Sequence, residues 1–358
     1  MKVFKFAICL LLLAATFGSL LLADHAYVLG NRVSVIDTAT DRVVTTIGAG
    51  NAPQALAPTP DGSKLYVANY ASDNVTVIDG RTDTVLATVP VGSTPTGILA
   101  TPDGGKVYVI NRMSNDVSVI ETATDQVVAT VSVGTLPSYA AFTADGTKVY
   151  VTSYVSGDVA VIDTALDQVI ATVPVGGGPL GITMSPDGTR AYVAQDTAGQ
   201  MSVIDTEFDA IVATVQVGSL PKKVTLSSDG ARAYVANLGS HNVSVVETAT
   251  NRLLATVAVG LNPYSVTLTS DGSKAYVTNY TGNSISVIET ATHRVIATVA
   301  VGRGPLHVAL TSDGAKAYVT NEFTENVSVI ETATGRVSAL VPIGGYLRAI
   351  VMADSQGA

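Results

Sequence analysis

A four-residue pattern that returns at a fixed interval limits what this chain can fold into. Tyr276-Val277-Thr278-Asn279 is repeated letter for letter at Tyr318-Val319-Thr320-Asn321. Looser copies begin at a tyrosine every 42 residues before these two, at Tyr66, Tyr108, Tyr150, Tyr192 and Tyr234. A further copy begins at Tyr27, which lies 39 residues before Tyr66. A period of this size indicates an array of similar units rather than several unrelated domains.

Each period contains four short β-type patterns joined by turn residues. In the last complete period the predicted strands cover residues 305–311, 316–320, 327–331 and 336–343, and we call them strands A, B, C and D. Asp313-Gly314 marks the turn between strands A and B. Strand D segments such as 295–299 carry small or apolar residues at every position, which predicts sheets packed between neighbours on both faces. Four antiparallel strands per unit are the module of a β-propeller blade, whereas a β-solenoid usually has shorter coils.

The number of units predicts how the ring closes. Seven complete A-B-C-D units begin at a proline, namely Pro53, Pro95, Pro137, Pro179, Pro221, Pro263 and Pro305. Before them, residues 26–47 supply only strands B, C and D, and after them residues 347–352 supply only a strand A. Together these pieces make an eighth blade, whose backbone hydrogen bonds would join the two ends of the chain. The alternative is a seven-bladed ring with residues 26–47 as an accessory layer.

The composition supports a large core and excludes several kinds of site. Apolar residues make up 47% of the 358 residues, charged residues make up 14%, and the formal charge is −9. Net acidity disfavours broad binding to nucleic-acid phosphates. The only cysteine is Cys9, so the rest of the chain has no disulfide, no thiolate zinc site and no Cys-x-x-Cys-His haem attachment.

Residues 1–23 have the pattern of an export signal. Lys2 and Lys5 precede an uncharged run over residues 6–23. We expect a cleaved signal peptide, with an uncleaved N-terminal anchor as the alternative, and membrane contact only in the second case. The expected product is extracytoplasmic, whether periplasmic, secreted or at the cell surface. It would consist of one propeller domain over residues 24–353 and a short tail over 354–358.

The repeated motifs resemble the YVTN-type β-propeller repeat over about residues 26–352. The resemblance rests on Tyr276-Val277-Thr278-Asn279, on Val287 to Thr292, on Ala297 to Gly302 and on Ser185-Pro186-Asp187-Gly188. It implies a propeller of bacterial or archaeal surfaces and periplasms, among them parts of surface-layer proteins. Related propellers include lactonases, quinoprotein subunits and a periplasmic DNA-binding protein. The family is often seven-bladed, so eight copies depart from its usual number.

Two sets of acidic residues recur with the period. The first precedes glycine at the A–B turn, at Asp61, Asp103, Asp145, Asp187, Asp229, Asp271 and Asp313. The second ends strand C, at Asp37, Asp79, Glu121, Asp163, Asp205, Glu247, Glu289 and Glu331. A ring of carboxylates that binds cations is one interpretation. Turn formation and surface pairing with the lysine or arginine past each turn is favoured, because calcium sites gather several oxygens within one loop.

The residues that differ between units are the candidates for a binding site. They lie in the D–A connection, at the start of strand A and just after strand B, and strand direction places all three at one mouth of the central channel. Aromatic and cationic side chains gather there, at Tyr70, Arg112, Tyr139, Tyr154, Lys222, Lys223, Tyr264, Tyr280, Arg303, His307 and Arg348. Such side chains suit a sugar, an anionic small molecule or a peptide carboxylate. The alternative is unconstrained drift on a loop face.

Signatures of catalysis are sparse. His307 is the single histidine in the candidate set, and neither Gly-x-Ser-x-Gly nor His-Glu-x-x-His occurs. We therefore predict a binding or scaffold module for a small molecule, a glycan or a protein, with no cofactor and no metal. A lactonase-like or redox-accessory propeller, using Lys222, Lys223, His307 and Arg348, is the second hypothesis. Binding of single-stranded nucleic acid by the cations and tyrosines is the third.

Overall fold

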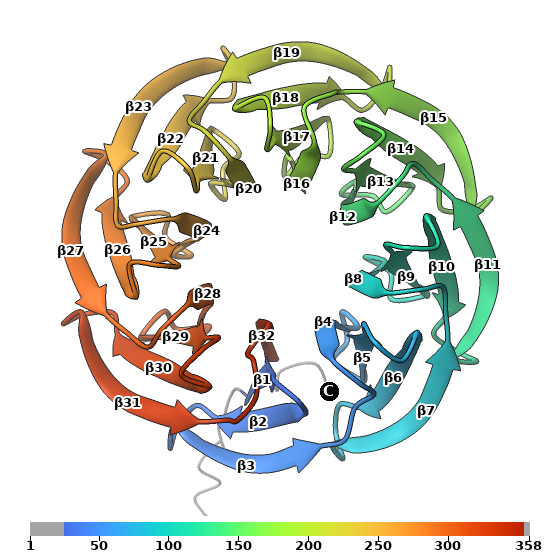
Figure 1. The fold of residues 1–358 in the computed structure, drawn as a ribbon, viewed down its shortest axis with the longest axis horizontal. Coiled ribbons are helices and arrows are strands. Elements are labelled where there is room, and N and C mark those ends of the chain that lie inside the picture. The colour runs from blue at the N-terminus through green and yellow to red at the C-terminus, as the bar shows by residue number, and fades with distance from the viewer. Residues whose placement is uncertain (1–24, 354–358) are drawn as a thin grey trace, which may run out of the picture.

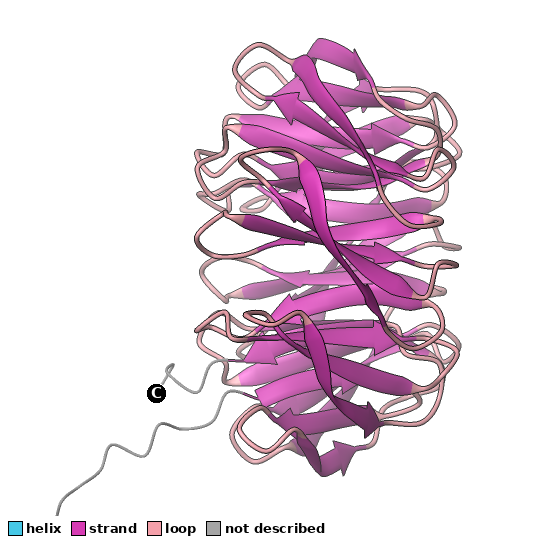
Figure 2. Cartoon of the chain, turned by 90° about the vertical axis from the view of Figure 1, so that its left-hand side faces the viewer, coloured by secondary structure: helices cyan, strands magenta, loops and turns pink. Residues whose placement is uncertain are grey.

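The computed structural model describes residues 25–353, and within this range the chain is an all-β propeller. Eight four-stranded antiparallel sheets surround a central axis (Figure 1), and loops project from both faces of the ring (Figure 2). The predicted eight blades are confirmed, and the seven-bladed alternative is wrong. The expected export segment and the tail lie outside the described residues. Between residues 25 and 353 no helix is long and apolar enough to cross a membrane.

The strands take the same four places in every blade. Strand A is innermost, in β32 (Ala349–Ala353), β4 (Pro53–Pro58), β8 (Pro95–Ala100), β12 (Pro137–Phe142), β16 (Pro179–Met184), β20 (Pro221–Leu226), β24 (Pro263–Leu268) and β28 (Pro305–Leu310). Strand B follows in β1 (His25–Leu29), β5 (Lys64–Asn69), β9 (Lys106–Asn111), β13 (Lys148–Ser153), β17 (Arg190–Gln195), β21 (Arg232–Asn237), β25 (Lys274–Asn279) and β29 (Lys316–Asn321). Strand C is β2 (Val33–Asp37), β6 (Asn74–Asp79), β10 (Asp116–Glu121), β14 (Asp158–Asp163), β18 (Gln200–Asp205), β22 (Asn242–Glu247), β26 (Ser284–Glu289) and β30 (Asn326–Glu331). Strand D is outermost, in β3 (Arg42–Ile47), β7 (Thr84–Pro90), β11 (Gln126–Ser132), β15 (Gln168–Pro174), β19 (Ala210–Gln216), β23 (Arg252–Ala258), β27 (Arg294–Ala300) and β31 (Arg336–Pro342).

Blade one is built from both ends of the described chain, and blades two to eight follow in sequence order. β32 pairs antiparallel with β1, with Val351 opposite Tyr27. The amide of Arg348 also donates to the carbonyl of Leu29 at 2.9 Å. Leu347 is fully buried in a cluster that contains Val28 of the same blade and Tyr318 of blade eight. The split blade predicted from the repeat count is therefore confirmed.

The core lies between neighbouring blades. Strands B and C are buried along nearly their whole length, and their side chains pack against the adjacent blade. One cluster joins Tyr66 and Val77 of blade two to Val107 and Val109 of blade three. Burial on both faces explains the continuous apolar runs of these strands, and each large side chain contributes about 1.5–3 kcal/mol.

Strand D does not follow the expectation of packing on both faces. In β27 Ile296 is 51% exposed, and Val299 is the buried residue near the strand's end. The pairing register passes from Val295 to Ala297, so Ile296 forms a β-bulge against strand C. A bulge increases local twist and disturbs the open edge of an outermost strand. Position at the circumference, rather than residue type, decides the exposure of this strand (Figure 1).

Candidate functional site

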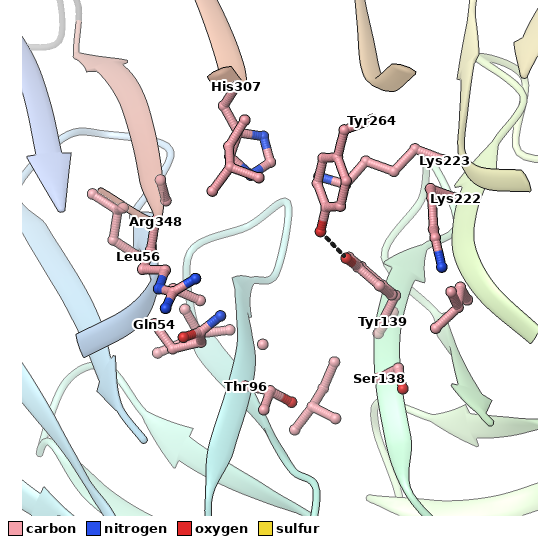
Figure 3. Close-up of a pocket in the computed structure, with 18 of the residues that line it drawn as sticks. Gln54, Leu56, Thr96, Ser138, Tyr139, Lys222, Lys223, Tyr264, His307 and Arg348 are labelled. Atoms are coloured by element: carbon pink, nitrogen blue, oxygen red, sulfur yellow. Dashed lines mark hydrogen bonds between the residues drawn. The ribbon is translucent and has the colours of Figure 1, made fainter. Parts of the chain in front are cut away.

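The mouth of the central channel holds a cavity of about 640 Å³ (Figure 3). The D–A connections and the B–C loops meet on this side of the ring, which we call the loop face. Strand A begins there at a proline, after a residue with positive φ such as Leu136 (55°) or Asn262 (53°). In most blades the turn directs the two residues that follow the proline to the cavity, for example Ser138 and Tyr139. The repeated turn thus places the variable residues of different blades around one space.

The two sides of the cavity differ in the size of their side chains. Blades two and three present the small residues Ala55 and Gly97 beside the polar Gln54, Thr96 and Arg112. Leu56, Ile98 and Ile110 of these blades also line the cavity and are largely buried, and we call them the apolar wall. The other side carries long side chains, namely Tyr139, Lys222, Lys223, Tyr264 and His307. Figure 3 shows Leu56 beside Gln54 and Arg348 on one side of the open space, and Tyr139, Lys223 and Tyr264 on the other.

Gly181 in strand A of blade five is required by the packing of neighbouring blades rather than by the cavity. A β-carbon on Gly181 would lie 2.6 Å from the carbonyl oxygen of Lys222 in the next blade. Backbone cannot move away as a flexible side chain can, so the close approach of blades five and six requires glycine there. By contrast, a β-carbon on Gly97 would meet the flexible end of Ile110 at 2.8 Å.

Lys223 lies between two tyrosine rings. Its Nζ is 5.6 Å from the ring centre of Tyr139 and 5.7 Å from that of Tyr264. The hydroxyls of these tyrosines are 3.4 Å apart, although Tyr139 belongs to blade four and Tyr264 to blade seven. The ring of His307 meets that of Tyr264 edge-on, with centres 6.0 Å apart. Four side chains from four blades therefore form one cluster across the channel, with cation–π contacts to the lysine.

The surroundings of this cluster shift its acid–base behaviour. Burial lowers the pKa of Lys223 to about 8, since protein walls replace much of the water around its ammonium group. Burial also lowers the pKa of His307 well below its usual range, and the charge of Lys223 adds to the effect. Burial raises the pKa of Tyr139. At neutral pH the imidazole of His307 is therefore neutral, and Lys223 is mostly charged.

Two other cations of the cavity are neutralised by carboxylates. Lys222 forms an ion pair with Asp196 at 2.8 Å, and Tyr154 donates to the same carboxylate at 3.1 Å. Arg348 forms an ion pair with Glu322 at 2.5 Å. Among the described lining residues, Lys223 and Arg112 are the cations without a carboxylate partner.

Arg112 and Tyr280 complete the polar side of the cavity. Arg112 donates to the hydroxyl of Ser138 at 3.2 Å, which holds the guanidinium at the edge of the space. The hydroxyl of Tyr280 donates to Glu322 at 2.6 Å. Both carboxylates of the site are thus held by a lysine or arginine together with a tyrosine.

Eight of the eleven sequence-predicted site residues line the cavity, namely Arg112, Tyr139, Lys222, Lys223, Tyr264, Tyr280, His307 and Arg348. The other three lie elsewhere on the loop face. Tyr70 lines a neighbouring pocket of about 570 Å³, together with Tyr346. Tyr154 does not line the cavity but donates a hydrogen bond to Asp196. Arg303 is exposed at the rim. The ligand-binding role of all eleven remains a prediction.

Sequence reasoning left out Asp196 and Glu322 as site residues, although a signal for both was present. They occupy the same repeat position as Tyr70 and Tyr280, just after strand B, and they are acidic where most copies are not. The apolar wall was also missed, because Leu56, Ile98 and Ile110 match the ordinary strand pattern.

A row of aromatic rings leads from the cavity to the rim. The ring centres of Tyr264 and Tyr280 are 6.4 Å apart, those of Tyr280 and Phe323 are 5.7 Å apart, and those of Phe323 and Tyr346 are 6.4 Å apart. Arg348 approaches the face of Tyr346, with its guanidinium carbon 5.9 Å from the ring centre. The rings are tilted or perpendicular to one another, so they form a wall rather than a flat stacking surface.

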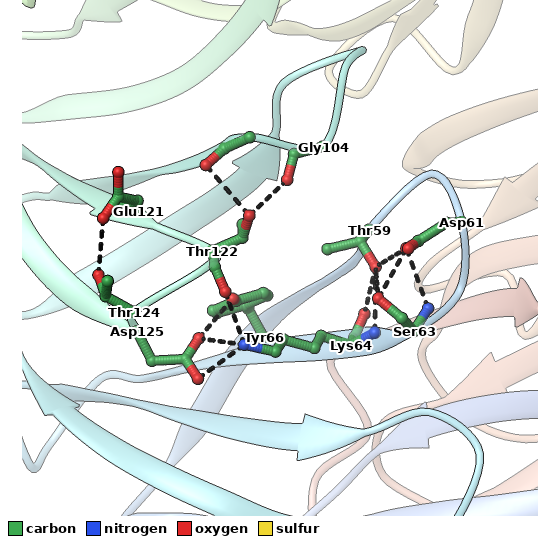
Figure 4. A network of polar contacts seen from close by, with 11 residues as sticks. Thr59, Asp61, Ser63, Lys64, Tyr66, Gly104, Glu121, Thr122, Thr124 and Asp125 are labelled. Atoms are coloured by element: carbon green, nitrogen blue, oxygen red, sulfur yellow. Dashed lines mark hydrogen bonds and ion pairs between the residues drawn. The ribbon is translucent and has the colours of Figure 1, made fainter.

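The repeated acids lie on the opposite face and form turns. Asp61 accepts a hydrogen bond from the amide of Ser63 at 3.0 Å (Figure 4), and Asp79 accepts from the amides of Arg81 and Thr82 at 2.9 Å. In residues 25–353 no group of three or more His, Cys, Asp and Glu side chains could hold a metal ion. Their bonds support turn formation rather than the alternative of a cation-binding ring.

A third set of acids, in the C–D turns, joins the blades. Lys64 and Tyr66 of blade two both donate to Asp125 of blade three, at 2.8 Å and 2.7 Å (Figure 4). We call this arrangement the interblade latch. The turn residue is aspartate at Asp41, Asp83, Asp125, Asp167 and Asp209, and it is replaced at Asn251, His293 and Gly335. In five blades the tyrosine of the repeated four-residue pattern therefore bonds an aspartate of the next blade, namely at Tyr27, Tyr66, Tyr108, Tyr150 and Tyr318.

Comparison with known proteins supports the fold class. The family model of the choice-of-anchor I domain, a propeller-type family, matches residues 153–304. No curated protein matches the chain. Hydrazine synthase of Kuenenia stuttgartiensis is similar at 26% identity and a TM-score of 0.65, over 79% of this chain and 96% of that chain.

Two further solved structures share the fold. The dihydro-heme d1 dehydrogenase NirN, in complex with DHE, matches over 91% of this chain and 74% of its own, with 16% identity and a TM-score of 0.77. A functionally unknown protein from Desulfotomaculum acetoxidans matches over 80% of this chain and 98% of its own, with 19% identity and a TM-score of 0.63. At such identities these two likenesses concern the fold alone.

Proposed function

We propose that this protein is an exported binding module that holds an amphipathic organic anion at the mouth of its channel. The observation that carries the proposal is the cavity of about 640 Å³, which Leu56, Ile98 and Ile110 line together with Lys223, a cation without a carboxylate partner. Two observations support export. Residues 1–23 have a basic start followed by an uncharged run, and the family whose model matches is described as a choice-of-anchor domain.

The charge of the cavity favours an anion. Lys223 is shielded from water by Tyr139 and Tyr264 and has no protein carboxylate beside it. A ligand carboxylate would supply the missing opposite charge in surroundings where water screens it weakly. Arg112 offers a second donor with guanidinium geometry. These cations gather on a protein whose formal charge is −9, so they are not part of a generally basic surface.

The apolar wall favours a ligand with a hydrocarbon or aromatic body. Leu56, Ile98 and Ile110 line the cavity, and each of them is at most 9% exposed. Covering about 100 Å² of apolar surface contributes roughly 2.5 kcal/mol. The volume falls within the range typical of small-molecule sites, about 300–1,000 Å³. A carboxylate alone would leave this wall uncovered, so an amphipathic anion fits better than a simple one.

Calorimetric titration with 4-phenylbutyrate and its neutral amide tests the proposal. We expect the carboxylate to bind at least about tenfold more tightly, because it alone can pair with Lys223. The substitution Lys223→Gln should remove that preference. Phe208→Ser is the matched control, since Phe208 is 71% exposed in a C–D turn on the opposite face. Equal binding of acid and amide, or a preference that survives in Lys223→Gln, would contradict the proposal.

A redox-accessory role is the second candidate. Two of the similar structures are enzymes by title, and NirN was determined with DHE bound. His307 presents a neutral imidazole to the cavity, a form that can ligate a metal centre. Titration with haemin should then give a Soret shift that is lost in His307→Ala. Turnover of lactones would instead support the lactonase-like alternative.

Binding of single-stranded nucleic acid is less well supported. Asp196 and Glu322 neutralise Lys222 and Arg348, so only part of the cationic set is left for phosphates. Phosphate binding would show retention on single-stranded DNA that falls steeply with salt. No retention at low salt removes this alternative.

A further inference from the structure

Lys222 and Lys223 are adjacent in strand A but lie in different surroundings. Asp196 holds the Lys222 ammonium group at 2.8 Å. Lys223 contacts tyrosine rings instead, and its Nζ lies 5.6 and 5.7 Å from the ring centres of Tyr139 and Tyr264. An amine that is paired with a carboxylate stays protonated, whereas an amine in partly dry surroundings without a carboxylate can lose its proton more easily.

We propose that Lys223 is a covalent anchor that forms a reversible imine with an aldehyde or ketone group of a ligand in the channel cavity. The inference deepens the proposed function and rests on it for the location of the ligand. It adds a chemical class, a carbonyl compound that also carries an anionic group.

The reaction is a condensation without an external oxidant or reductant. The lone pair of neutral Lys223 Nζ forms a bond to the carbonyl carbon, and the π electrons of the C=O bond move to oxygen. A proton then passes from the nitrogen to this oxygen, which gives a neutral carbinolamine. A second proton, equal to the one that Lys223 lost to become neutral, protonates the hydroxyl group, which leaves as water while the nitrogen lone pair forms the C=N bond. In sum, an ammonium and a carbonyl give a protonated imine and one water molecule, so the charge at the site is unchanged.

The cluster around Lys223 suits this sequence of steps. Burial lowers the pKa of Lys223 to about 8, so a useful fraction of neutral amine exists near pH 7.5. The neutral imidazole of His307 lies against Tyr264 and can carry protons between oxygen and nitrogen. The hydroxyls of Tyr139 and Tyr264 face each other at 3.4 Å and can donate to the carbonyl oxygen.

The aromatic rings also suit the product. Tyrosine faces favour the ammonium form of Lys223, which by itself opposes loss of the proton. A protonated imine is likewise a cation, and the same two rings would stabilise it. Lys222 is at a disadvantage, because the neutral amine that attacks the carbonyl would have to give up the ion pair with Asp196. The structure therefore distinguishes two neighbouring lysines by chemistry rather than by access alone.

Reductive trapping tests the inference directly. The intact protein is incubated at pH 7.5 with limiting 4-formylbenzoate and sodium cyanoborohydride, and the labelled lysines are located by peptide fragmentation. We expect Lys223 to be labelled at least about tenfold faster than Lys222, which serves as the internal control in the same peptide. Excess benzoate should slow the labelling of Lys223 by competing for the cavity.

A variant keeps the test decisive. Lys223→Arg preserves the charge but cannot form an imine, and its folding is checked by its melting temperature. Total labelling should then fall to the level of the exposed lysines. Equal labelling of Lys222 and Lys223, or no loss of labelling in Lys223→Arg, overturns the inference.

The inference and the proposed function can fail separately. If carboxylates bind more tightly than amides but Lys223 is not trapped, the covalent step is wrong and the binding module stands. If neutral benzaldehyde labels Lys223 selectively while carboxylates show no preference over amides, the covalent anchor stands and the anion-binding function is wrong.

Discussion

Lys316 donates to both carboxylate oxygens of Asp41 at 2.9 Å, although the two residues are 275 positions apart in the chain. Lys316 belongs to blade eight and Asp41 to blade one, so this ion pair is an interblade latch across the closure of the ring. Tyr318 donates to the same carboxylate. The pairing of β32 with β1 closes the ring through the sheet, and the latch closes it again on the face opposite the cavity.

The missing latch between blades seven and eight can be restored. Gly335 occupies the latch position there, with a φ of 66° and nothing within 4 Å of an added β-carbon. Aspartate adopts the same conformation at Asp125, with a φ of 55°. Gly335→Asp should therefore bond Lys274 and Tyr276 and stabilise the fold by about 1 kcal/mol, which raises the melting temperature by roughly 1–2 °C. A melting temperature at or below that of the native protein contradicts this prediction.

Removing a latch hydroxyl should be costly only where a carboxylate accepts its bond. Tyr66→Phe leaves Asp125 without the donor at 2.7 Å, and we expect a loss of about 1–2 kcal/mol. Tyr276→Phe is the matched control, because Gly335 offers no carboxylate, and it should change stability by less than about 0.5 kcal/mol. Urea unfolding of both variants measures the difference. Equal losses would show that the hydroxyl bond to aspartate adds nothing.

The sequence predicts the fold well because its constraints are repeated. The four-residue strand pattern occurs eight times, and the proline and the Asp-Gly turn each recur seven times in register, so errors in one unit are corrected by the others. The exposure of Ile296 could not be predicted this way, because it depends on a bulge at the circumference of the ring. The latch aspartates recur in the sequence every 42 residues. The side chains that bond them could not be predicted, because they lie in the neighbouring blade.

The candidate site was predictable in composition but not in pairing. Deviation from the repeat identifies Lys222, Lys223 and Tyr264 as unusual. The contact of Tyr139 with Tyr264, 125 residues apart, depends on the diameter of the closed ring. The ion pair that separates Lys222 from Lys223 likewise depends on how Asp196 projects from the adjacent blade. Such contacts follow from tertiary geometry, which the repeat pattern does not encode.

Deleting residues 346–358 should open the ring. The deletion removes β32, its pairing with β1, and the buried side chains of Leu347 and Ile350. Losing two such side chains alone costs about 3–6 kcal/mol, so the melting temperature should fall by roughly 10 °C or more. Deleting only residues 354–358 is the control and should have little effect. Equal melting temperatures for the two truncations would show that the split blade adds no stability.

Acid should weaken the A–B turns. The hydroxyl of Thr269 and the amide of Ser273 both bond the Asp271 carboxylate and lower its pKa to about 2, and its counterparts in other blades shift in the same direction. Because the folded pKa lies below the unfolded one, this stabilisation is complete above about pH 4 and is lost as the pH falls towards 2. Melting temperatures should stay level from pH 7 to 5 and then drop. In Asp271→Asn the melting temperature should fall less below pH 5 than in the native protein. Identical melting temperatures across this pH range would contradict the stabilising role of the Asp271 carboxylate.

Replacing Lys223 by methionine should stabilise the protein while removing anion binding. Burial lowers the folded pKa of Lys223 to about 8, whereas the unfolded value is near 10.4, so its charge is destabilising at neutral pH and this cost disappears as the pH rises between the two values. The contacts with Tyr139 and Tyr264 offset part of the cost, which leaves a net gain of about 1 kcal/mol for Lys223→Met at pH 7. The gain should shrink towards pH 10, when native Lys223 is neutral as well. Melting curves at pH 7 and pH 10, with Phe208→Ser as the control, measure the gain in stability and its decrease at the higher pH. A variant that is less stable than the native protein at pH 7 would show that the tyrosine rings more than offset the burial of the charge.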